Sequence, residues 1–133
     1  MHPLDDRSFV ERMDPSGMLR LTEEFPEQCR RALAIAHTAH IQPLASAPSC
    51  VVLTGLGGSA AGGDFVKCLF DDGGQCPFIV NRDYSLPSFV DGRSLVFAVS
   101  YSGNTEETAS AYHDAKSKGA RVIAVTTGGT LAE

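Results

Sequence analysis

The sequence predicts an α/β fold: a parallel sheet between two layers of helices. Three observations support this prediction. Four short runs of apolar and β-branched residues lie at 51–54, 77–81, 94–99 and 121–126. The runs are continuous rather than alternating, which is typical of strands buried on both faces of a parallel sheet. Helical patterns separate the first run from the second and the third from the fourth, as the crossover connections of such a sheet require.

Composition limits what the chain can do. The chain has 133 residues, of which 43% are hydrophobic and 20% charged, and its formal net charge is −5. This size suits one domain. An acidic balance without a basic stripe argues against a nucleic-acid partner and against docking on an anionic membrane. No apolar run reaches the ~20 residues of a membrane span, and the N-terminus does not resemble a secretory signal.

The four cysteines favour a reducing compartment. Cys29, Cys50, Cys68 and Cys76 form no C-x-x-C pair. We therefore interpret them as free thiols and expect a cytoplasmic protein.

The first fifty residues differ from the rest of the chain. Between Met18 and Ile41, apolar residues recur every three or four positions, which predicts helices. Pro26 falls near the start of the longer helix, where proline is tolerated. Pro43 and Pro48 then mark a loop. We expect residues 1–49 to form a helical segment that packs on the domain, and residues 50–133 to form the domain itself.

Two helices are expected between the strands, at about 60–70 and 105–118. Asn104 is the expected N-cap of the second helix, with Glu107 three residues later, and Gly119 is placed to end it. The segment 83–92 is too short for a crossover helix. Residues 130–133 resemble the first turn of another helix. Because open parallel sheets usually continue with one more strand, we expect a domain that lacks its last strand, from a truncated chain.

The loop after the first strand is rich in glycine. Gly57 and Gly58 precede Ser59 at a predicted helix start, where backbone N–H groups can approach an anion closely. A tight turn with Ser59 as N-cap explains the same residues. The loop also fits the dinucleotide fingerprint G-x-G-x-x-A with Gly55, Gly57 and Ala60. That motif requires an acid after the second strand, where the chain has Asn81, Arg82 and Asp83.

The loop after the third strand carries three hydroxyls within six residues. Ser100, Ser102 and Thr105 surround Gly103 and Asn104 just before a predicted helix. Hydroxyls and helix N–H groups together can hold a phosphate without a basic residue. The alternative is an ordinary N-cap with solvated hydroxyls, and the neighbouring glutamates Glu106 and Glu107 favour it. Because both loops follow neighbouring strands, we expect one anion site at that edge of the sheet.

The remaining candidates are weaker. The loop after the fourth strand, with Thr127, Gly128 and Gly129, could close over the sugar end of a ligand or could be a plain turn. His37 and His40 share a helix face but have no other ligand nearby, so we expect no metal site. His113 is expected at the surface. The residues around Ser59 do not form a G-x-S-x-G nucleophile elbow.

These loops resemble the SIS (sugar isomerase) domain, most closely in the first half of bifunctional phosphoglucose/phosphomannose isomerases. The resemblance rests on Gly57-Gly58-Ser59, on the stretch from Tyr101 to Thr108, and on Thr127-Gly128-Gly129 followed by Leu131 and Ala132. It implies a flavodoxin-like fold with five parallel strands. It also implies that Ser59, Ser100, Ser102 and Thr105 bind the phosphate of a sugar phosphate.

The resemblance further implies a homodimer that interconverts aldoses and ketoses without a metal or organic cofactor. Expected ligands are glucose 6-phosphate, fructose 6-phosphate and mannose 6-phosphate. In the family, the glutamate base and a histidine lie beyond the matched region, so the catalytic residues remain unknown and we expect this chain alone to bind rather than react. Two alternatives stay open: a non-catalytic phosphosugar sensor, which would need a basic helix-turn-helix partner, and a dinucleotide-binding domain.

Overall fold

The computed structural model describes residues 2–133. The chain divides into two compact units, one ending at Pro43 and the other spanning Leu44–Glu133. The positions of the two units relative to one another are not determined, so each is described by itself.

The first unit is helical. It contains a short 3-10 helix, Pro3–Asp5, and the helices α1 (Arg7–Met13), α2 (Met18–Glu23) and α3 (Phe25–Thr38). Pro26 lies in the first turn of α3, as predicted, where its missing N–H has no intrahelical partner to lose. None of these helices has a buried residue.

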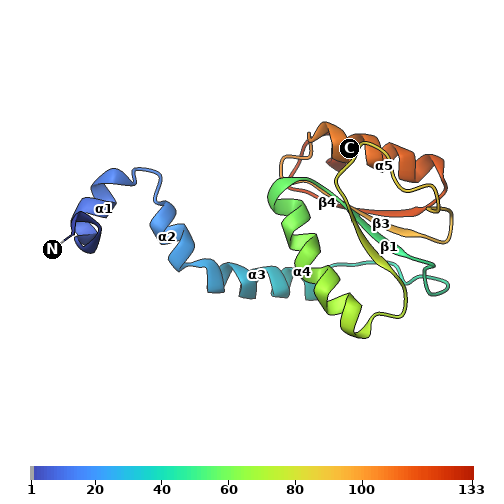
Figure 1. The fold of residues 1–133 in the computed structure, drawn as a ribbon, viewed down its shortest axis with the longest axis horizontal. Helices are drawn as coiled ribbons and strands as arrows, with labels where there is room; N and C mark the ends of the chain where they lie inside the picture. The colour runs from blue at the N-terminus through green and yellow to red at the C-terminus, as the bar shows by residue number, and fades with distance from the viewer. Residues whose placement is uncertain (1) are drawn as a thin grey trace. The chain divides into compact units, whose positions relative to one another are not determined.

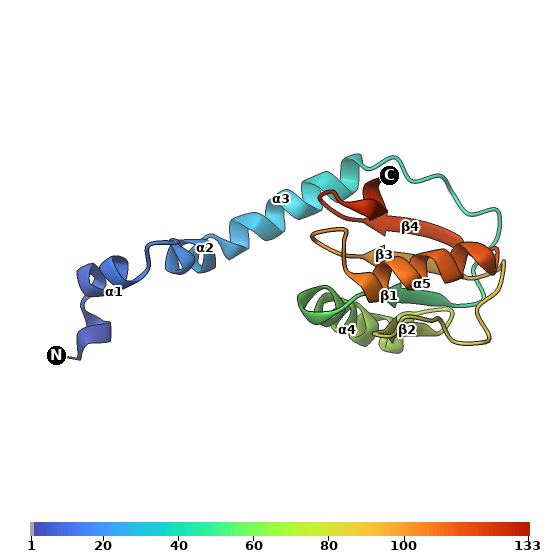
Figure 2. The ribbon, with the colours of Figure 1, turned by 90° about the horizontal axis from the view of Figure 1, so that it is seen from above.

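The second unit is built on a parallel sheet of four strands: β1 (Val51–Thr54), β2 (Phe78–Asn81), β3 (Leu95–Val99) and β4 (Arg121–Val125). Their order in the sheet is β2-β1-β3-β4 (Figures 1 and 2). In register, Thr54 at the end of β1 lies opposite Asn81 of β2 and Ala98 of β3. The carboxyl ends of these three strands therefore meet at one edge of the sheet.

Helices cover both faces of the sheet. α4 (Gly57–Gly73) lies against β2 and β1 on one face, and α5 (Glu106–Ser117) lies against β3, β4 and β1 on the other (Figure 2). Alternate residues of each strand belong to two separate apolar clusters: Val52 and Val96 face α5, whereas Val51 and Leu95 face the α4 side. The three-layer α/β/α prediction is confirmed.

Three details differ from the predictions. α4 begins at Gly57, inside the glycine run that read as a loop, and Ser59 is its third residue rather than its N-cap. The N-cap of α5 is Thr105, not Asn104. β4 is not buried on both faces: α5 packs on one face, whereas α4 on the other side of the sheet lies against β2 and β1, and Val125 is 50% exposed.

Other predicted features are present. Segment 83–92 contains no helix, and Gly119, with φ of 72°, follows the end of α5. Residues Thr130–Ala132 form one 3-10 turn. Two hydrogen bonds fasten the helix-free segment to the end of α5: Lys118 Nζ donates to the carbonyl of Leu86 at 3.0 Å, and the N–H of Leu86 donates to Asp114 Oδ2 at 2.8 Å. The Lys118 ammonium also forms a salt bridge with the Asp114 carboxylate at 2.9 Å.

Candidate functional site

The candidate site lies where the chain reverses its direction across the sheet. From β1 the chain passes to β2 on one side and then returns to β3 on the other side of β1. The loops that follow β1 and β3 therefore separate, one entering α4 and the other leading to α5. In open parallel sheets, this switch point outside the carboxyl ends of the strands is where ligands bind.

A hollow of about 550 Å³ opens at this point. Its lining residues come only from the two loops and the first turn of α4: Leu56, Gly58, Ser59, Ser100, Tyr101, Ser102 and Thr105. The four hydroxyl residues predicted to form an anion site thus line one hollow, although Ser59 lies some forty residues before the others. Ser100 is buried, Ser59 and Thr105 are half-buried, and Ser102 is exposed.

Hydrogen bonds hold the hydroxyls of the loop after β3 in place. Ser100 Oγ lies 2.9 Å from Thr105 Oγ1 and accepts the backbone N–H of Gly103 at 3.1 Å. Ser102 Oγ accepts the backbone N–H of Asn104 at 3.2 Å. Each hydroxyl still has a proton or a lone pair that a ligand can use.

Two helices begin beside the hollow, and neither is capped by a side chain. The N-cap of α4 is Leu56, which has no capping group, and the N-cap Thr105 of α5 makes no side-chain cap hydrogen bond. The first N–H groups of a helix have no intrahelical partner, and they carry the positive end of the helix dipole. Both helix starts therefore favour a negatively charged group in the hollow.

The glutamates in the first turn of α5 do not line the hollow. Glu107 lies beside Tyr84 of the segment after β2 instead. The charge of Glu107 is the main reason why the pKa of Tyr84 is raised above its ordinary value, and a hydrogen bond between the two side chains adds to the effect. The carboxylate of Glu107 is thus directed away from the predicted anion site.

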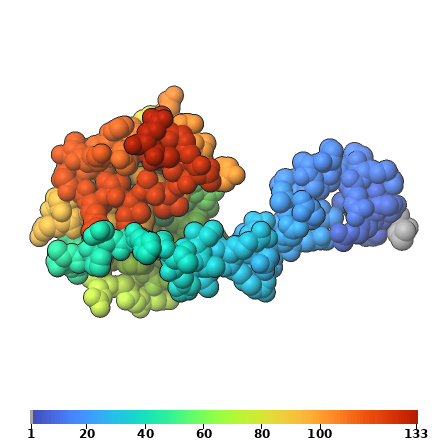
Figure 3. Space-filling model, turned by 180° about the vertical axis from the view of Figure 1, so that it is seen from behind, coloured from blue at the N-terminus to red at the C-terminus, as the bar shows by residue number. Residues whose placement is uncertain are grey.

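The loop after β4 forms hydrogen bonds with the loop after β3. Thr127 Oγ1 donates to the carbonyl of Tyr101 at 2.7 Å, and Thr130 Oγ1 donates to the carbonyl of Gly103 at 2.9 Å. Asn104 Oδ1, expected to cap α5, accepts the N–H of Thr130 at 3.1 Å instead. In Figure 3 the dark red C-terminal residues lie against the orange residues of this loop.

The residues of the loop after β4 that were predicted to face the sugar lie next to the hollow. Thr127, Gly128 and Gly129 do not line the hollow, although they lie beside the loop that does. Gly103 has φ of 69°, and a Cβ there would overlap the carbonyl oxygen of Gly128. The loop therefore requires glycine at position 103 for both its backbone conformation and its contact.

Sequence reasoning missed two lining residues. Leu56 and Tyr101 contribute to the hollow, and the Tyr101 side chain is 80% exposed. Tyr101 stands between Ser100 and Ser102, and this position in the sequence could have indicated that it lines the site. Leu56 gave none, since an apolar residue in a glycine loop has no distinctive chemistry.

Across residues 2–133, no group of three or more histidine, cysteine or acidic side chains is arranged to hold a metal ion. His37, His40 and His113 are exposed, the last as predicted. All four cysteines are free thiols. None of the helices in this range is long and apolar enough to cross a membrane.

The lining of the hollow is rich in groups that bind an anion. It offers hydroxyl and backbone N–H donors together with the apolar side chain of Leu56 and the ring of Tyr101. It contains no carboxylate or imidazole, the groups that most often act as general bases. The two loops can therefore hold an anion.

The fold and the switch-point loops are those of a SIS domain, and the SIS domain family matches residues 44–132. The chain belongs to this family. It is 51% identical over 116 residues to the bifunctional phosphoglucose/phosphomannose isomerase of Caldicellulosiruptor bescii, covering 87% of this chain and 34% of the relative. The enzyme of the same description from Thermoplasma acidophilum is 47% identical over 85 residues, or 64% of this chain and 26% of the relative.

A solved structure leads to the same family. A Bacillus subtilis protein assigned as a phosphosugar isomerase superimposes with a TM-score of 0.61 at 30% identity, over 66% of this chain and 29% of that one. This chain thus spans about a third, or less, of the proteins it matches.

Proposed function

We propose that this chain binds a sugar phosphate, with the phosphate group in the hollow between the loops after β1 and β3. One observation carries the proposal: four hydroxyl side chains and two helix starts without side-chain caps surround the same hollow. Ser59, Ser100, Ser102 and Thr105 would hold the phosphate oxygens, and the backbone at Gly57, Gly58, Gly103 and Asn104 would let them approach.

The donors are sufficient for a measurable affinity. A hydrogen bond to a charged acceptor contributes roughly 1.5–3 kcal/mol. Two or three such bonds reach about 4–8 kcal/mol, which corresponds to a dissociation constant between millimolar and micromolar. A phosphate carrying nearly two negative charges is therefore held without an arginine or lysine.

The substrate class follows from the relatives named above. Glucose 6-phosphate, fructose 6-phosphate and mannose 6-phosphate are the proposed ligands, and aldose–ketose isomerisation is the proposed reaction of the whole protein. That reaction moves a proton between C1 and C2 of the sugar and needs a positioned base but no metal or organic cofactor. We assign this chain the phosphate-binding role and propose that the base comes from outside the hollow, from a part of the protein that this chain does not match.

Two further proposals accompany this function. A homodimer would fit a site whose catalytic groups come from outside the matched region, and size-exclusion chromatography with light scattering tests it directly. A cytoplasmic location would fit four free thiols and a sugar phosphate ligand. A mass spectrum of the protein from cells that reports four reduced thiols would support that location.

The test is a calorimetric titration of the purified chain with glucose 6-phosphate, fructose 6-phosphate, mannose 6-phosphate, inorganic phosphate and NAD. Ser102→Ala should weaken the sugar phosphates roughly 10- to 100-fold, since it removes one hydrogen bond to a charged group. Ser110→Ala is the matched control, because Ser110 is an exposed serine of α5 that does not line the hollow. Equal affinities in the two variants, or a response to NAD alone, would contradict the proposal.

A further inference from the structure

The residues that line the hollow between the loops after β1 and β3 fall into two chemical groups. One group offers hydroxyls or bare backbone: Gly58, Ser59, Ser100, Ser102 and Thr105. The other group, Leu56 and Tyr101, brings large side chains with apolar surface. In small-molecule sites, polar groups fix the orientation of a ligand, whereas apolar and aromatic side chains cover its body. The second group therefore indicates a ligand that is larger than a phosphate ion.

The two groups lie at different depths. Ser100, directly after β3, is 2% exposed, whereas its neighbour Tyr101 is 80% exposed and Leu56 is 36% exposed. A phosphate that reaches the Ser100 hydroxyl therefore occupies the inner part of the hollow. The rest of the ligand then extends outward, between Leu56 and Tyr101. Because a short ester linkage joins the phosphorus to the carbon skeleton, the sugar of a sugar phosphate begins beside these two side chains.

Tyr101 is held in position through its backbone, and its ring is free to contact a ligand. The Tyr101 carbonyl accepts hydrogen bonds from the N–H of Thr127 at 3.2 Å and from Thr127 Oγ1 at 2.7 Å. The aromatic and cation–π contacts within residues 2–133 all involve other rings. Tyrosine has two rotatable side-chain bonds, so that fixing its ring on a ligand costs little conformational entropy.

Leu56 occupies a position where a leucine does not stabilise its helix. It is the N-cap residue of α4 and makes no side-chain cap hydrogen bond. Serine, threonine, aspartate and asparagine are preferred at N-caps because their oxygens accept N–H groups of the first turn. A capping oxygen would occupy the N–H groups that favour an anion. The leucine leaves these groups free and presents an apolar side chain to the hollow instead.

The apolar group also answers a question of selectivity. Inorganic phosphate carries nearly the same charge and oxygens as the phosphate group of a sugar phosphate, so hydroxyls and helix N–H groups alone cannot distinguish the two. Selectivity is a difference between two affinities, and it requires contacts with the part in which the ligands differ. Leu56 and Tyr101 are the lining residues placed to make such contacts.

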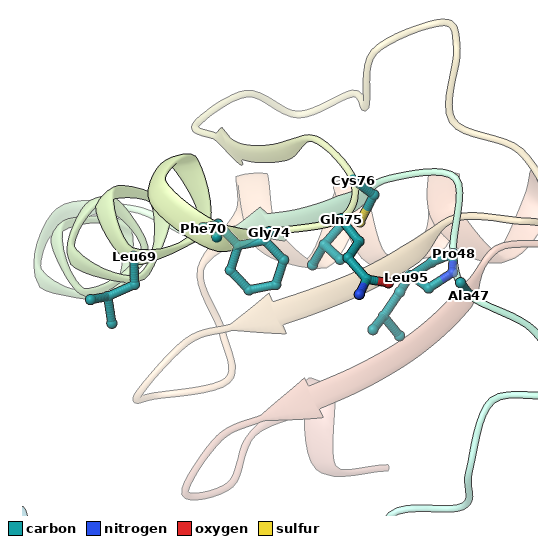
Figure 4. Close-up of a pocket in the computed structure, with 10 residues that line it drawn as sticks. Ala47, Pro48, Leu69, Phe70, Gly74, Gln75, Cys76 and Leu95 are labelled. Atoms are coloured by element: carbon teal, nitrogen blue, oxygen red, sulfur yellow. The ribbon is translucent and has the colours of Figure 1, made fainter.

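A second hollow in the same unit lacks this combination of donors and apolar side chains. It measures about 610 Å³ and lies near the amino ends of β1 and β3, away from the hydroxyl loops. Figure 4 shows its lining, which includes Leu69 and Phe70 of α4 and Leu95 of β3. Among the described lining residues, none is charged and none carries a hydroxyl. This second hollow is therefore poorly suited to a phosphate.

We propose that Tyr101, together with Leu56, binds the sugar portion of the ligand and makes the site selective for sugar phosphates over inorganic phosphate. The Tyr101 ring packs against C–H groups on one face of the sugar, because the face of an aromatic ring is electron-rich and these hydrogens are weakly positive. Leu56 covers the sugar from the side of α4. This inference rests on the proposed function, since it concerns the part of the ligand beyond the phosphate.

The test is a calorimetric titration with fructose 6-phosphate, glucose 6-phosphate and inorganic phosphate. Tyr101→Ala should weaken both sugar phosphates roughly tenfold, because the sugar loses an aromatic surface, and should leave inorganic phosphate unchanged. Tyr101→Phe keeps the ring and should bind all three ligands like the unchanged chain. Ser102→Ala should weaken all three ligands, since it acts on the phosphate. Leu69→Ala is the control, because it removes a 76% exposed side chain from the second hollow.

A fluorescence measurement reports the contact itself. The chain contains no tryptophan, so Tyr101→Trp introduces a single fluorophore at the hollow. The tryptophan emission should shift to shorter wavelength when fructose 6-phosphate binds, because the sugar displaces water from the ring. Saturation with inorganic phosphate should leave the emission where it was.

The outcomes separate this inference from the proposed function. If neither the sugar phosphates nor inorganic phosphate binds the unchanged chain, the phosphate site is wrong and the role of Tyr101 falls with it. If they bind, but Tyr101→Ala changes sugar phosphates and inorganic phosphate by the same factor, only the role of Tyr101 is overturned. Weaker sugar phosphate binding in Leu69→Ala would also overturn it, because the sugar would then occupy the second hollow. An unchanged Tyr101→Trp emission with bound fructose 6-phosphate would do the same.

Discussion

The hydroxyl groups of Ser100 and Thr105 lie 2.9 Å apart, and this contact determines how α5 begins. Thr105 is the N-cap residue, yet its hydroxyl bonds Ser100 rather than the first N–H groups of the helix. Those N–H groups therefore stay available at the edge of the hollow. The pair also holds the buried Ser100 hydroxyl where it accepts the N–H of Gly103.

Ser100 should contribute to both the stability of the domain and sugar phosphate binding, whereas Ser102 should contribute to binding alone. Ser100→Ala removes a buried hydroxyl with two hydrogen bonds, so we expect a loss of about 1–2 kcal/mol in the free energy of unfolding as well as weaker sugar phosphate binding. Ser102→Ala removes an exposed hydroxyl and should weaken binding with little change in stability. Urea unfolding of both variants, beside the binding titration, separates the two effects. A Ser100→Ala protein as stable as the unchanged chain would contradict this assignment.

Gly103→Ala should destabilise the domain more than any other glycine substitution in the site loops. The residue has φ of 69°, and the added Cβ would meet the carbonyl of Gly128. We expect a loss of at least about 1–3 kcal/mol, because both strain and overlap must be relieved. Gly62→Ala is the control: it lies in α4 with open space around the new Cβ, so it should be neutral or stabilising by up to about 1 kcal/mol. Thermal unfolding distinguishes the two.

Asp114 should make stability depend on pH in the acid range. The pKa of Asp114 is lowered below its ordinary value of 3.8. The largest cause is the hydrogen bond from the N–H of Leu86, and the second is the hydrogen bond from the Lys118 ammonium. A lowered pKa in the folded state means that the stabilisation is complete above the unfolded value and is lost as pH falls through the folded one. Asp114→Asn should therefore cost about 1 kcal/mol near neutral pH.

The pH dependence of the stability lost in Asp114→Asn tests whether the Asp114 carboxylate is the stabilising group. The difference between Asp114→Asn and the unchanged chain should shrink as the pH falls below about 4, because the unchanged chain then loses its own carboxylate. Unfolding by urea at several pH values measures this difference. Asp72→Asn removes the same charge from an exposed position on α4 and serves as the control. A difference that stays constant down to the lowest pH would refute the linkage.

Thr108→Val should stabilise the protein. Thr108 is fully buried, and its hydroxyl has no hydrogen-bond partner among the described residues. Valine has nearly the same shape without the unsatisfied polar atom, so we expect a gain of about 1 kcal/mol. Thr108→Ser keeps the hydroxyl, removes a buried methyl group and should lose about 1 kcal/mol. Melting temperatures of the two variants should move in opposite directions. A loss of stability in Thr108→Val would show that the hydroxyl has a partner.

Much of the site could be predicted because its chemistry is contained in short stretches. Ser100, Ser102 and Thr105 lie within six residues, and Ser59 follows a glycine run directly after a strand. The expectation that they meet required only that parallel strands end at one edge of the sheet. The position of Leu56 in the hollow had no such signal. The roles of Asn104 and Thr127 were also hidden, because their hydrogen bonds join residues 26 positions apart.

The sequence by itself determined the four strands, the helices between them and the loops that carry the hydroxyls. The reason is that apolar periodicity and glycine placement act over a few neighbouring residues. Only the tertiary structure decided that the Thr105 hydroxyl bonds Ser100 instead of capping α5. The same holds for the hydrogen bond by which the loop after β4 supports the loop after β3, and for the exposed face of β4. Each of these depends on which distant segments come into contact, and contact between distant segments is set by the packing of the sheet and its helices rather than by any local pattern.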